Sequence, residues 1–252
     1  MFVDIHSHAL PGVDDGSKQW KMTLEMFKQA VEQDITHMVL TPHYIEGDRD
    51  YCLDTVMSAY ERSKQLIQEQ GLDLNVSLGN EVFIDEKNVT RLKNKECMTL
   101  NGTSYVLLEL PAHISTSALE GLIYDLQLEG YQPVFAHVER YDWLYRRPIL
   151  FKELLNHGVL MQINATSVLS SDWRMRRRVK HLIQEGMVHI VASDAHDDVK
   201  RRFRLKEAYE KVGRKYGWKL ANCLFIENPL RVIRDKYVGV PEKAQEGIWW
   251  RR

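Results

Sequence analysis

The chain opens with MFVDIHSHALPGVDDG, in which two histidines spaced by one residue end an apolar stretch and a pair of aspartates follows. Successive residues of a strand point to opposite faces, so His6 and His8 would project to the same side. Imidazole nitrogens and carboxylate oxygens are common ligands of divalent transition metals. This segment therefore predicts one corner of a metal site, provided that other strands end in similar residues.

The elements that must position such a site follow from the apolar pattern. Short β-branched runs alternate with helical patterns over the first 235 residues, which is typical of βα units around a parallel sheet. We predict strands at residues 2–5, 37–41, 74–79, 105–110, 133–137, 160–164 and 189–193. Seven such units in one uninterrupted chain favour a closed or nearly closed barrel.

The segments between these strands carry apolar residues at helical spacing, which would pack against the sheet. One predicted helix face consists of Trp20, Leu24, Phe27 and Val31. A second face consists of Leu119, Leu122, Ile123 and Leu126. Glycines stand where these helices should stop, and there they predict left-handed caps: Gly71, Gly130, Gly158 and Gly186.

Six of the seven predicted strands end at or beside a residue that can ligate a metal, and only the strand ending at Asn164 lacks one. Beyond the first strand, these residues are His43, Glu81, Glu109, His137 and the pair Asp194 and His196. The C-terminal ends of the strands of a βα barrel meet at one rim, where functional residues collect. The pattern therefore predicts a single cluster of ligands.

Adding Asp15 from the first loop gives nine candidate ligands, five imidazoles and four carboxylates, which is enough for two or three metal ions. Nitrogen and oxygen ligands without thiolates suit Mn2+, Fe2+ or Zn2+ and argue against a structural zinc. Three divalent ions and four carboxylates leave a formal charge of about +2. Such a site favours a dianion, and a phosphate monoester is the natural candidate. Arg140 and Arg201 would add guanidinium donors for its oxygens.

This charge distribution predicts phosphoester hydrolysis. Clustered metals acidify a water to hydroxide at neutral pH and hold the phosphoryl oxygens for in-line attack. A phenolic leaving group, with a pKa near ~10, departs with modest help, whereas an alkyl alcohol needs a general acid. Asp15 or a protonated His196 could supply that proton if it is not bound to a metal. The catalytic candidates are Asp15, His43, His196, Arg140 and Arg201.

Composition limits the other functions. With 34 basic and 35 acidic residues the net charge is −1, so no nucleic-acid or membrane partner is indicated globally. The N-terminus does not resemble a signal peptide, and no apolar run approaches the ~20 residues of a membrane span. The three cysteines form no CxxC motif, which favours the cytoplasm. The residues six positions after them are Ser58, Thr103 and Pro229, so a phosphatase that pairs cysteine with arginine at that spacing is excluded.

We expect one barrel domain over residues 1–238 and a C-terminal tail over 239–252. The tail ends in Trp249–Arg252, residues that could make a weak contact with a membrane surface. The basic run from Trp173 to Lys180 could track phosphates, although such runs are more often solvated helix faces. The sequence does not define the oligomeric state.

With these residues in view, the chain resembles the PHP (polymerase and histidinol phosphatase) superfamily. More closely, it resembles the bacterial PHP-type protein-tyrosine phosphatases of capsule and exopolysaccharide operons (the CpsB/YwqE type). The resemblance extends over roughly residues 1–206 and rests on DIHSHALPGVDDG, LTPHY, GNEVFI, YVLLELP, YDLQLEGYQPVFAHVER and VASDAH.

The resemblance implies an α/β fold, a distorted TIM-like (β/α)7 barrel of the PHP type. It also implies three metal ions, with manganese as the expected metal. By the superfamily pattern His6, His8, Glu81 and Asp194 would hold the first ion. Glu81 would bridge to a second ion shared with Glu109 and His137. Asp15, chosen over Asp14 by the same pattern, would join His43 and His196 at the third. The implied substrate is phosphotyrosine, typically on the C-terminal tail of a cognate bacterial tyrosine kinase that controls polysaccharide synthesis.

Two departures from the family pattern lie beside the expected phosphate site: Val138 and Tyr141 in the segment that usually reads HPERN, and Asp197 where asparagine is usual. Three other interpretations remain open. A histidinol-phosphate phosphatase would use the same cluster, a metal-dependent nuclease would cleave diesters, and a metal-stabilised scaffold would bind ions without turnover.

Overall fold

The computed structural model describes residues 1–47 and 51–239. Its strands are β1 (Phe2–Ser7), β2 (Ile35–Leu40), β3 (His43–Tyr44), β4 (Asn75–Leu78), β5 (Glu81–Phe83), β6 (Tyr105–Glu109), β7 (Gln132–Phe135), β8 (Leu160–Asn164) and β9 (Ile190–Ala192). All seven predicted strands are confirmed, with ends that differ by at most one or two residues. The predicted tail lies, apart from Gly239, outside the described residues.

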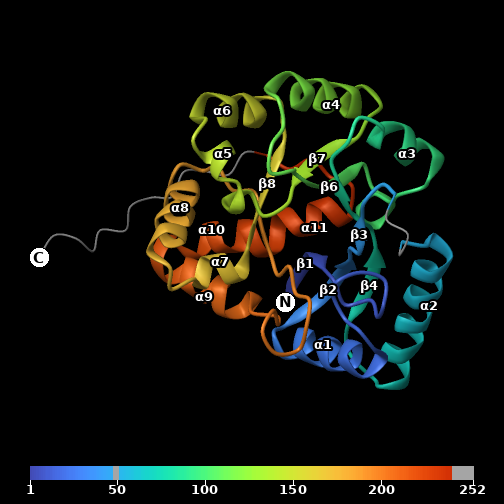
Figure 1. Ribbon diagram of the computed structural model, residues 1–252. Coiled ribbons are helices and arrows are strands. Elements are labelled where there is room, and N and C mark those ends of the chain that lie inside the picture. Colours follow the sequence, from blue (N-terminus) through green and yellow to red (C-terminus); the bar gives the residue numbers. More distant parts are fainter. Residues whose placement is uncertain (48–50, 240–252) are drawn as a thin grey trace, which may run out of the picture.

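Helices connect the parallel strands and surround them (Figure 1). They are α1 (Trp20–Glu32), α2 (Leu53–Glu69), α3 (Asn88–Asn94), α4 (Thr116–Leu128), α5 (Asp142–Tyr145), α6 (Pro148–Asn156), α7 (Ala165–Leu169), α8 (Trp173–Gln184), α9 (Leu205–Tyr216), α10 (Trp218–Asn222) and α11 (Asn228–Ile233). Shorter turns are the 3-10 helices η1 (Leu100–Gly102) and η2 (Val138–Arg140) and the π-helix η3 (Cys223–Glu227). Within the described residues no helix is both long and apolar enough to cross a membrane.

The parallel sheet curls into a distorted barrel. β1, β2 and β4 form one sheet, and β3, β5, β6, β7, β8 and β9 form another. The short strands β3 and β5 pair in the same register as β2 and β4, so each continues the preceding strand beyond a break. The ring closes between β1 and β9, where Ser7 bridges to Ala195 and the Asp194 N–H donates to the His6 carbonyl at 2.9 Å. The expected barrel is thus confirmed, with irregular pairing at its closure.

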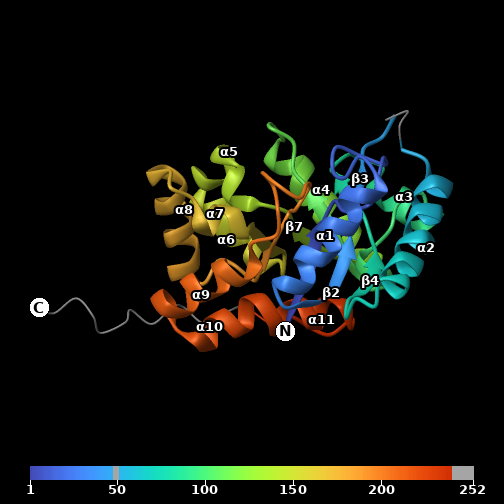
Figure 2. The same cartoon turned by 90° about the horizontal axis from the view of Figure 1, so that it is seen from below.

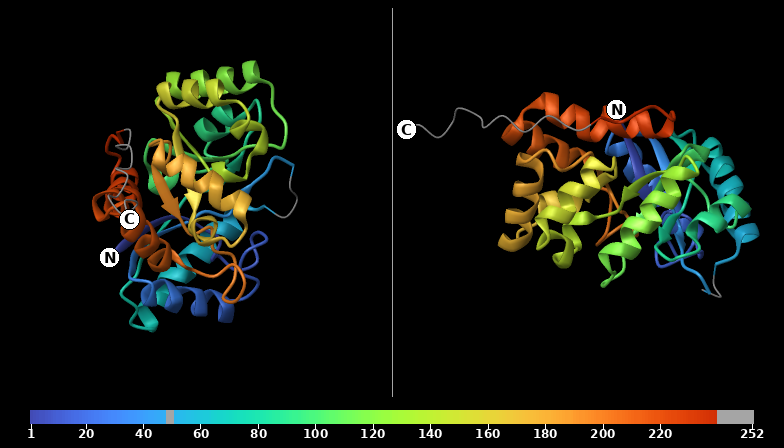
Figure 3. Two further views of the ribbon diagram at one scale, coloured as in Figure 1. Left: turned by 90° about the vertical axis from the view of Figure 1, so that its left-hand side faces the viewer. Right: turned by 90° about the horizontal axis from the view of Figure 1, so that it is seen from above.

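The barrel interior and its outer layer are both apolar. Alternate strand residues such as Val3, Ile5, Leu107 and Val134 form an interior cluster, to which Val232 of α11 contributes. Seen from below, α10 and α11 lie across the end of the barrel at which the chain begins (Figure 2), and the other side views agree (Figure 3). The C-terminal helices therefore close the amino ends of the strands, and the site is built at the carboxyl ends.

One helix face differs from its prediction. In α1 the buried residues are Thr23, Met26, Phe27 and Ala30, whereas Trp20 is 39% exposed. The face is rotated because the Thr23 hydroxyl donates to the Ala9 carbonyl at 2.8 Å, which allows a polar residue on the inner side. The other predicted face, on α4, is buried as expected, and the predicted glycine caps have positive φ angles.

Candidate metal centre

Glu81, the first residue of β5, lies at the centre of the predicted cluster. Its Oε2 is 3.1 Å from Nε2 of His6 and 3.2 Å from Nε2 of His8. The same oxygen is 3.2 Å from Nδ1 of His43, and Oε1 is 2.8 Å from Nε2 of His137. Four histidines from three parts of the chain therefore meet around one buried carboxylate.

His6 and His8 reach this carboxylate because β1 is irregular. Between Asp4 and Ser7 its pairing with β2 shifts register, which marks a bulge, and bulges re-aim the side chains of a strand. Beyond the bulge the two imidazoles converge, with their Nε2 atoms 3.1 Å apart. Asp194 also faces this pair, with Oδ1 at 3.4 Å from Nε2 of His6.

Asp15, His43 and His196 form a neighbouring group. The Asp15 Oδ1 atom is 3.3 Å from Nε2 of His196 and 3.5 Å from Nε2 of His43. The ring of His196 stacks on His8 with centroids 3.9 Å apart, which joins this group to the first. Ligand atoms of these four residues all lie within 4.8 Å of one another, a spacing that one ion could bridge.

Glu109 and His137 complete the cluster on its other side. Nε2 of His137 is 3.8 Å from Oε1 of Glu109, and Nδ1 of His43 is 3.7 Å from Oε2 of Glu109. Both His137 and Asp194 have left-handed backbones, with φ of 35° and 54°. With these angles the chain leaves β7 and β9 through turns rather than as continuing strands. Non-glycine residues with left-handed backbones cluster at functional sites.

The buried donors and acceptors of this cluster fit divalent cations. Because Nδ1 of His6 and Nδ1 of His8 both face oxygen acceptors, their Nε2 atoms are left with lone pairs that point at each other and at Glu81. Glu81 Oε2, His43 Nδ1 and His137 Nδ1 are buried and have no hydrogen-bond partner among the described residues. Lone pairs so close together repel unless cations lie between them, and the set contains no thiolate.

The same crowding shifts the pKa values of the carboxylates. Burial opposes the ionisation of Glu81, but the charge of His6 and the hydrogen bond with His137 hold its pKa well below the usual range. The hydrogen bond with His196 is the main cause of the lowered pKa of Asp15. Glu109 differs, because burial and the charge of Glu81 raise its pKa. Glu81 and Asp15 are therefore ionised, which is the form that binds metal.

Asp14 and Asp15 have separate positions. Asp14 Oδ2 is 2.7 Å from Nδ1 of His8 and accepts from the backbone N–H of His43, while Oδ1 accepts from Gly16. Asp14 therefore orients His8 from behind, whereas Asp15 is exposed toward His43 and His196. This geometry favours Asp15 as the ligand of the pair.

The two arginines proposed for phosphate lie at the edge of the cluster. Nη2 of Arg140 is 2.9 Å from Oδ2 of Asp194, and Nη2 of Arg201 is 3.1 Å from the same oxygen. Nη1 of Arg201 also lies 3.6 Å from Asp15. Their side chains are about two-fifths exposed, at 41% and 40%, so both remain accessible to an anion that enters from solvent.

The strand without a ligand, β8, supplies a supporting layer that the sequence did not predict. The side-chain oxygen Oε1 of Gln162 lies 3.2 Å from Nδ1 of His6 and accepts from the backbone N–H of His137 at 2.9 Å. Its amide donates to Asn164, whose own amide donates to Asp194 at 2.6 Å. The i, i+2 spacing of Gln162 and Asn164 on a strand leading to the rim was the available signal.

Replacing Gln162 by leucine should weaken metal binding without removing any ligand. The substitution takes away the acceptor that orients His6, and the loss of such partners typically lowers metal affinity by about 10- to 100-fold. Calorimetric titration of the metal-free protein with Mn2+ measures this change. Wild-type affinity in a folded Gln162→Leu protein would contradict the orienting role.

Two histidines that are not candidate ligands, His113 and His189, lie outside the cluster. His189 is buried, its Nδ1 accepts from the Met161 backbone, and burial lowers its pKa to about 4. His113 lines a separate pocket. In the basic helix α8, Arg178 pairs with Asp142 and donates to the Glu139 carbonyl, so part of its charge is used within the fold.

Comparison with known proteins assigns the chain to a family. The family described as capsular polysaccharide synthesis, CpsB/CapC, matches residues 2–234. Tyrosine-protein phosphatase YwqE of Bacillus subtilis is 31% identical over 237 residues, covering 94% of this chain and 93% of that protein. A putative tyrosine-protein phosphatase, CapC of Staphylococcus aureus, is 34% identical over 208 residues, covering 82% of each.

A solved structure agrees with this assignment. The chain is similar to one from the crystal structures of YwqE from Bacillus subtilis and CpsB from Streptococcus pneumoniae, described as unique metal-dependent tyrosine phosphatases. The TM-score is 0.88 at 30% identity, and the match covers 97% of this chain and 99% of that one. From its sequence, its barrel and its cluster of histidines and carboxylates, this chain belongs to the CpsB/CapC family.

Proposed function

We propose that this protein is a metal-dependent phosphomonoesterase that hydrolyses phosphotyrosine in proteins. The observation that carries the proposal is the convergence of nine potential ligands, Glu81 among them, in a member of the CpsB/CapC family. The relatives named as tyrosine-protein phosphatases match most of the chain. The proposed metal ligands are His6, His8, Asp15, His43, Glu81, Glu109, His137, Asp194 and His196.

We propose Mn2+ as the cofactor, in two or three ions per chain, with Fe2+ or Zn2+ as the alternatives that the same ligands accept. Ions held in these groups supply Lewis acidity toward the phosphoryl oxygens and acidify a water. With three divalent ions and four carboxylates, the loaded centre would carry a formal charge of about +2. That charge favours a phosphomonoester dianion over a neutral substrate.

The protein's own side chains divide the remaining work. Arg140 and Arg201 would release part of their pairing with Asp194 and donate to phosphate oxygens, for which guanidinium geometry is well suited. Asp15 and His196 lie 3.3 Å apart at the open side of the cluster. Because Asp15 is ionised there, the group that would pass a proton to the leaving phenolate is a protonated His196 that is not bound to a metal. A phenolate is a modest base, so this assistance need not be strong.

For the physiological substrate we propose a phosphotyrosine protein, specifically the C-terminal tail of a cognate bacterial tyrosine kinase that regulates capsular or extracellular polysaccharide synthesis. Support comes from the family's description and from the name of its Bacillus subtilis member. We propose the cytoplasm as the compartment, because Cys52, Cys97 and Cys223 form no disulfide. Residues 1–238 are proposed to act as one phosphatase domain.

Activity assays with paired substrates test this function. With Mn2+ present, the protein should hydrolyse p-nitrophenyl phosphate and phosphotyrosine peptides, and bis(p-nitrophenyl) phosphate far more slowly. Chelation with EDTA should abolish the activity, and added Mn2+ should restore it. A preference for the diester would indicate a nuclease, a preference for histidinol phosphate would indicate the small-molecule phosphatase, and bound metal without turnover would indicate a scaffold.

A further inference from the structure

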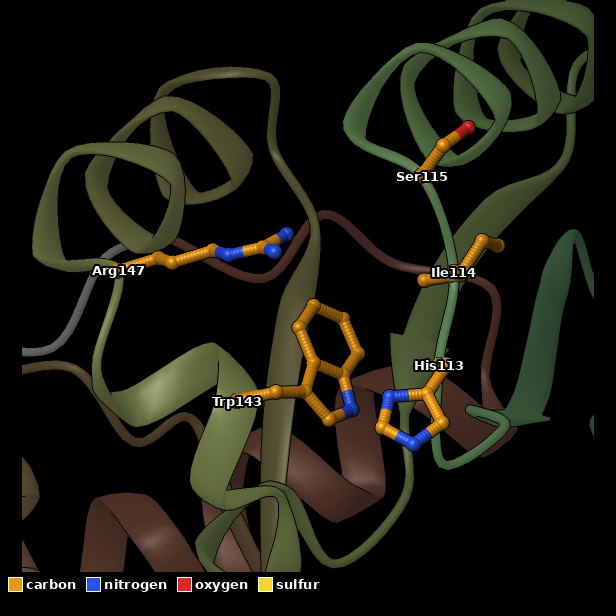
Figure 4. A pocket seen from close by; sticks show the side chains of 5 residues that line it. All are labelled: His113, Ile114, Ser115, Trp143 and Arg147. Carbon is orange, nitrogen blue, oxygen red and sulfur yellow. The ribbon is translucent and has the colours of Figure 1, made fainter.

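A pocket lies beside the metal centre, and none of its lining residues takes part in the proposed catalysis. It is a cavity of about 340 Å³ lined by His113, Ile114, Ser115, Trp143 and Arg147. The first three come from the loop between β6 and α4, and the other two come from α5 and the turn that follows it. Figure 4 shows the indole of Trp143 and the imidazole of His113 facing each other across this hollow, with Arg147 above them.

The lining is cationic and rich in donors. Arg147 makes a cation–π contact with Trp143, at 5.8 Å from the ring, and no ion pair with a carboxylate of the described residues. The Trp143 Nε1–H is buried, and no acceptor for it is present among residues 1–47 and 51–239. No acidic residue lines the cavity, and the nearby carboxylate of Asp142 is paired with Arg178. A buried donor without an acceptor carries a desolvation cost that an anionic ligand would remove.

The pocket is connected to the metal centre through Tyr141. The ring of Tyr141 lies 5.6 Å from that of His137 and 6.2 Å from that of Trp143, measured between centroids. Its hydroxyl accepts from the Leu110 backbone at 3.0 Å, which fixes the loop that leads from Glu109 to His113. An extended peptide advances ~3.3–3.6 Å per residue, so a residue within about four positions of a bound phosphotyrosine can reach the pocket.

We infer that this pocket, formed by His113, Trp143 and Arg147, is a specificity subsite for an anionic side chain that flanks the phosphotyrosine of a peptide substrate. The inference rests on the proposed phosphotyrosine phosphatase activity and adds the recognition of substrate sequence. An aspartate, a glutamate or a second phosphorylated residue supplies the required anion. Its oxygens accept from the Trp143 indole and pair with the Arg147 guanidinium, and only an anion makes the second contact charge-assisted.

The test compares phosphotyrosine peptides that differ at one flanking position. Glutamate is scanned over four positions on each side of the phosphotyrosine, and at the best position it is replaced by glutamine, phosphoserine, lysine or phenylalanine. We expect the glutamate or phosphoserine peptide to have a kcat/KM about tenfold above that of the glutamine peptide, as for one charge-assisted contact. The phosphoserine arm distinguishes a phosphate from a carboxylate as the preferred anion.

Variants of the pocket make the comparison specific. In Arg147→Glu the preference for the anionic peptide should disappear, and the kcat/KM of the lysine peptide should increase. Trp143→Phe, which keeps a ring but removes the N–H, should reduce the preference. The matched control Arg214→Ala, an exposed arginine on α9, should leave the preference intact. Hydrolysis of p-nitrophenyl phosphate should be unchanged in all three variants, because none of them alters the cluster around Glu81.

Two results would overturn the subsite. One is an equal kcat/KM for anionic and neutral peptides in the wild-type protein that cleaves p-nitrophenyl phosphate, which would leave the proposed phosphatase standing. The other is a preference that favours phenylalanine or persists in Arg147→Glu, because the occupant would then be apolar or bound elsewhere. Loss of all phosphatase activity in the wild-type protein with Mn2+ would instead reject the proposed function together with this inference.

Discussion

Replacing Glu81 by glutamine should remove metal binding and phosphatase activity together. The Glu81 carboxylate contacts His6, His8, His43 and His137 through its two oxygens, and it is ionised within the cluster. Glutamine keeps the shape but lacks the negative charge, and its NH₂ group would place protons where lone pairs face a cation. The loss of a ligand shared between ions should lower kcat/KM by at least ~10³-fold, which corresponds to several kcal/mol.

Metal content measured by elemental analysis, alongside turnover of p-nitrophenyl phosphate, checks this expectation. Glu139→Gln is the matched control. Glu139 is also buried, but its Oε1 accepts from the Asn164 backbone and glutamine can do the same, so metal should be retained. A Glu81→Gln protein that is folded, loaded with metal and fully active would exclude Glu81 from the centre of the site.

Replacing Arg140 by alanine should separate substrate binding from metal binding. The guanidinium pairs with Asp194 from a position that is partly open to solvent, so it is close enough to serve an anion without being a ligand itself. Hydrogen bonds to charged groups contribute about 1.5–3 kcal/mol, which predicts a decrease in kcat/KM of roughly 10- to 150-fold. The metal content should equal that of the wild-type protein.

Steady-state kinetics of Arg140→Ala and Arg140→Lys provide the measurement. Lysine keeps the charge but loses the planar pair of donors, so it should recover only part of the activity. Arg201→Ala should behave like Arg140→Ala, because both guanidinium groups reach the same Asp194 oxygen. Unchanged kinetics in the Arg140→Ala protein would assign that arginine a purely structural contact with Asp194.

The core of the site was predictable because its residues combine an unusual chemical type with a regular position. A histidine or a carboxylate at the end of one strand is unremarkable, but repetition at successive strand ends indicated a shared rim. The structure brings those side chains together, even where the strands break. His43 and Glu81 lie on the short strands β3 and β5, which hold them at the same level as His6.

The supporting residues were less visible because their signal depends on contacts across the barrel. Gln162 and Asn164 are neutral amides, and only the folded chain shows that they connect His6 to Asp194. The bulge in β1 and the left-handed backbone at His137 likewise depend on tertiary packing rather than on local propensity. The rotated face of α1 arose because a hydroxyl can be buried when it finds a carbonyl acceptor.

The pocket around Trp143 illustrates the same limit. His113 and Arg147 are far apart in the sequence, and neither lies at a strand end, so no periodic pattern connects them. Their relation appears only when the loops after β6 and β7 are placed beside each other. The proposed recognition of substrate sequence therefore depends on loop contacts, while the proposed metal ligands lie at the strand ends.

Anomalous diffraction from crystals of the catalytically active protein, recorded at the manganese edge after growth with Mn2+, tests the metal centre most directly. We expect two or three peaks around Glu81, each within about 2.0–2.3 Å of imidazole or carboxylate atoms of the nine proposed ligands. Active crystals without anomalous density among His6, His8, His43 and Glu81, or with metal bound only elsewhere, would contradict the proposed centre.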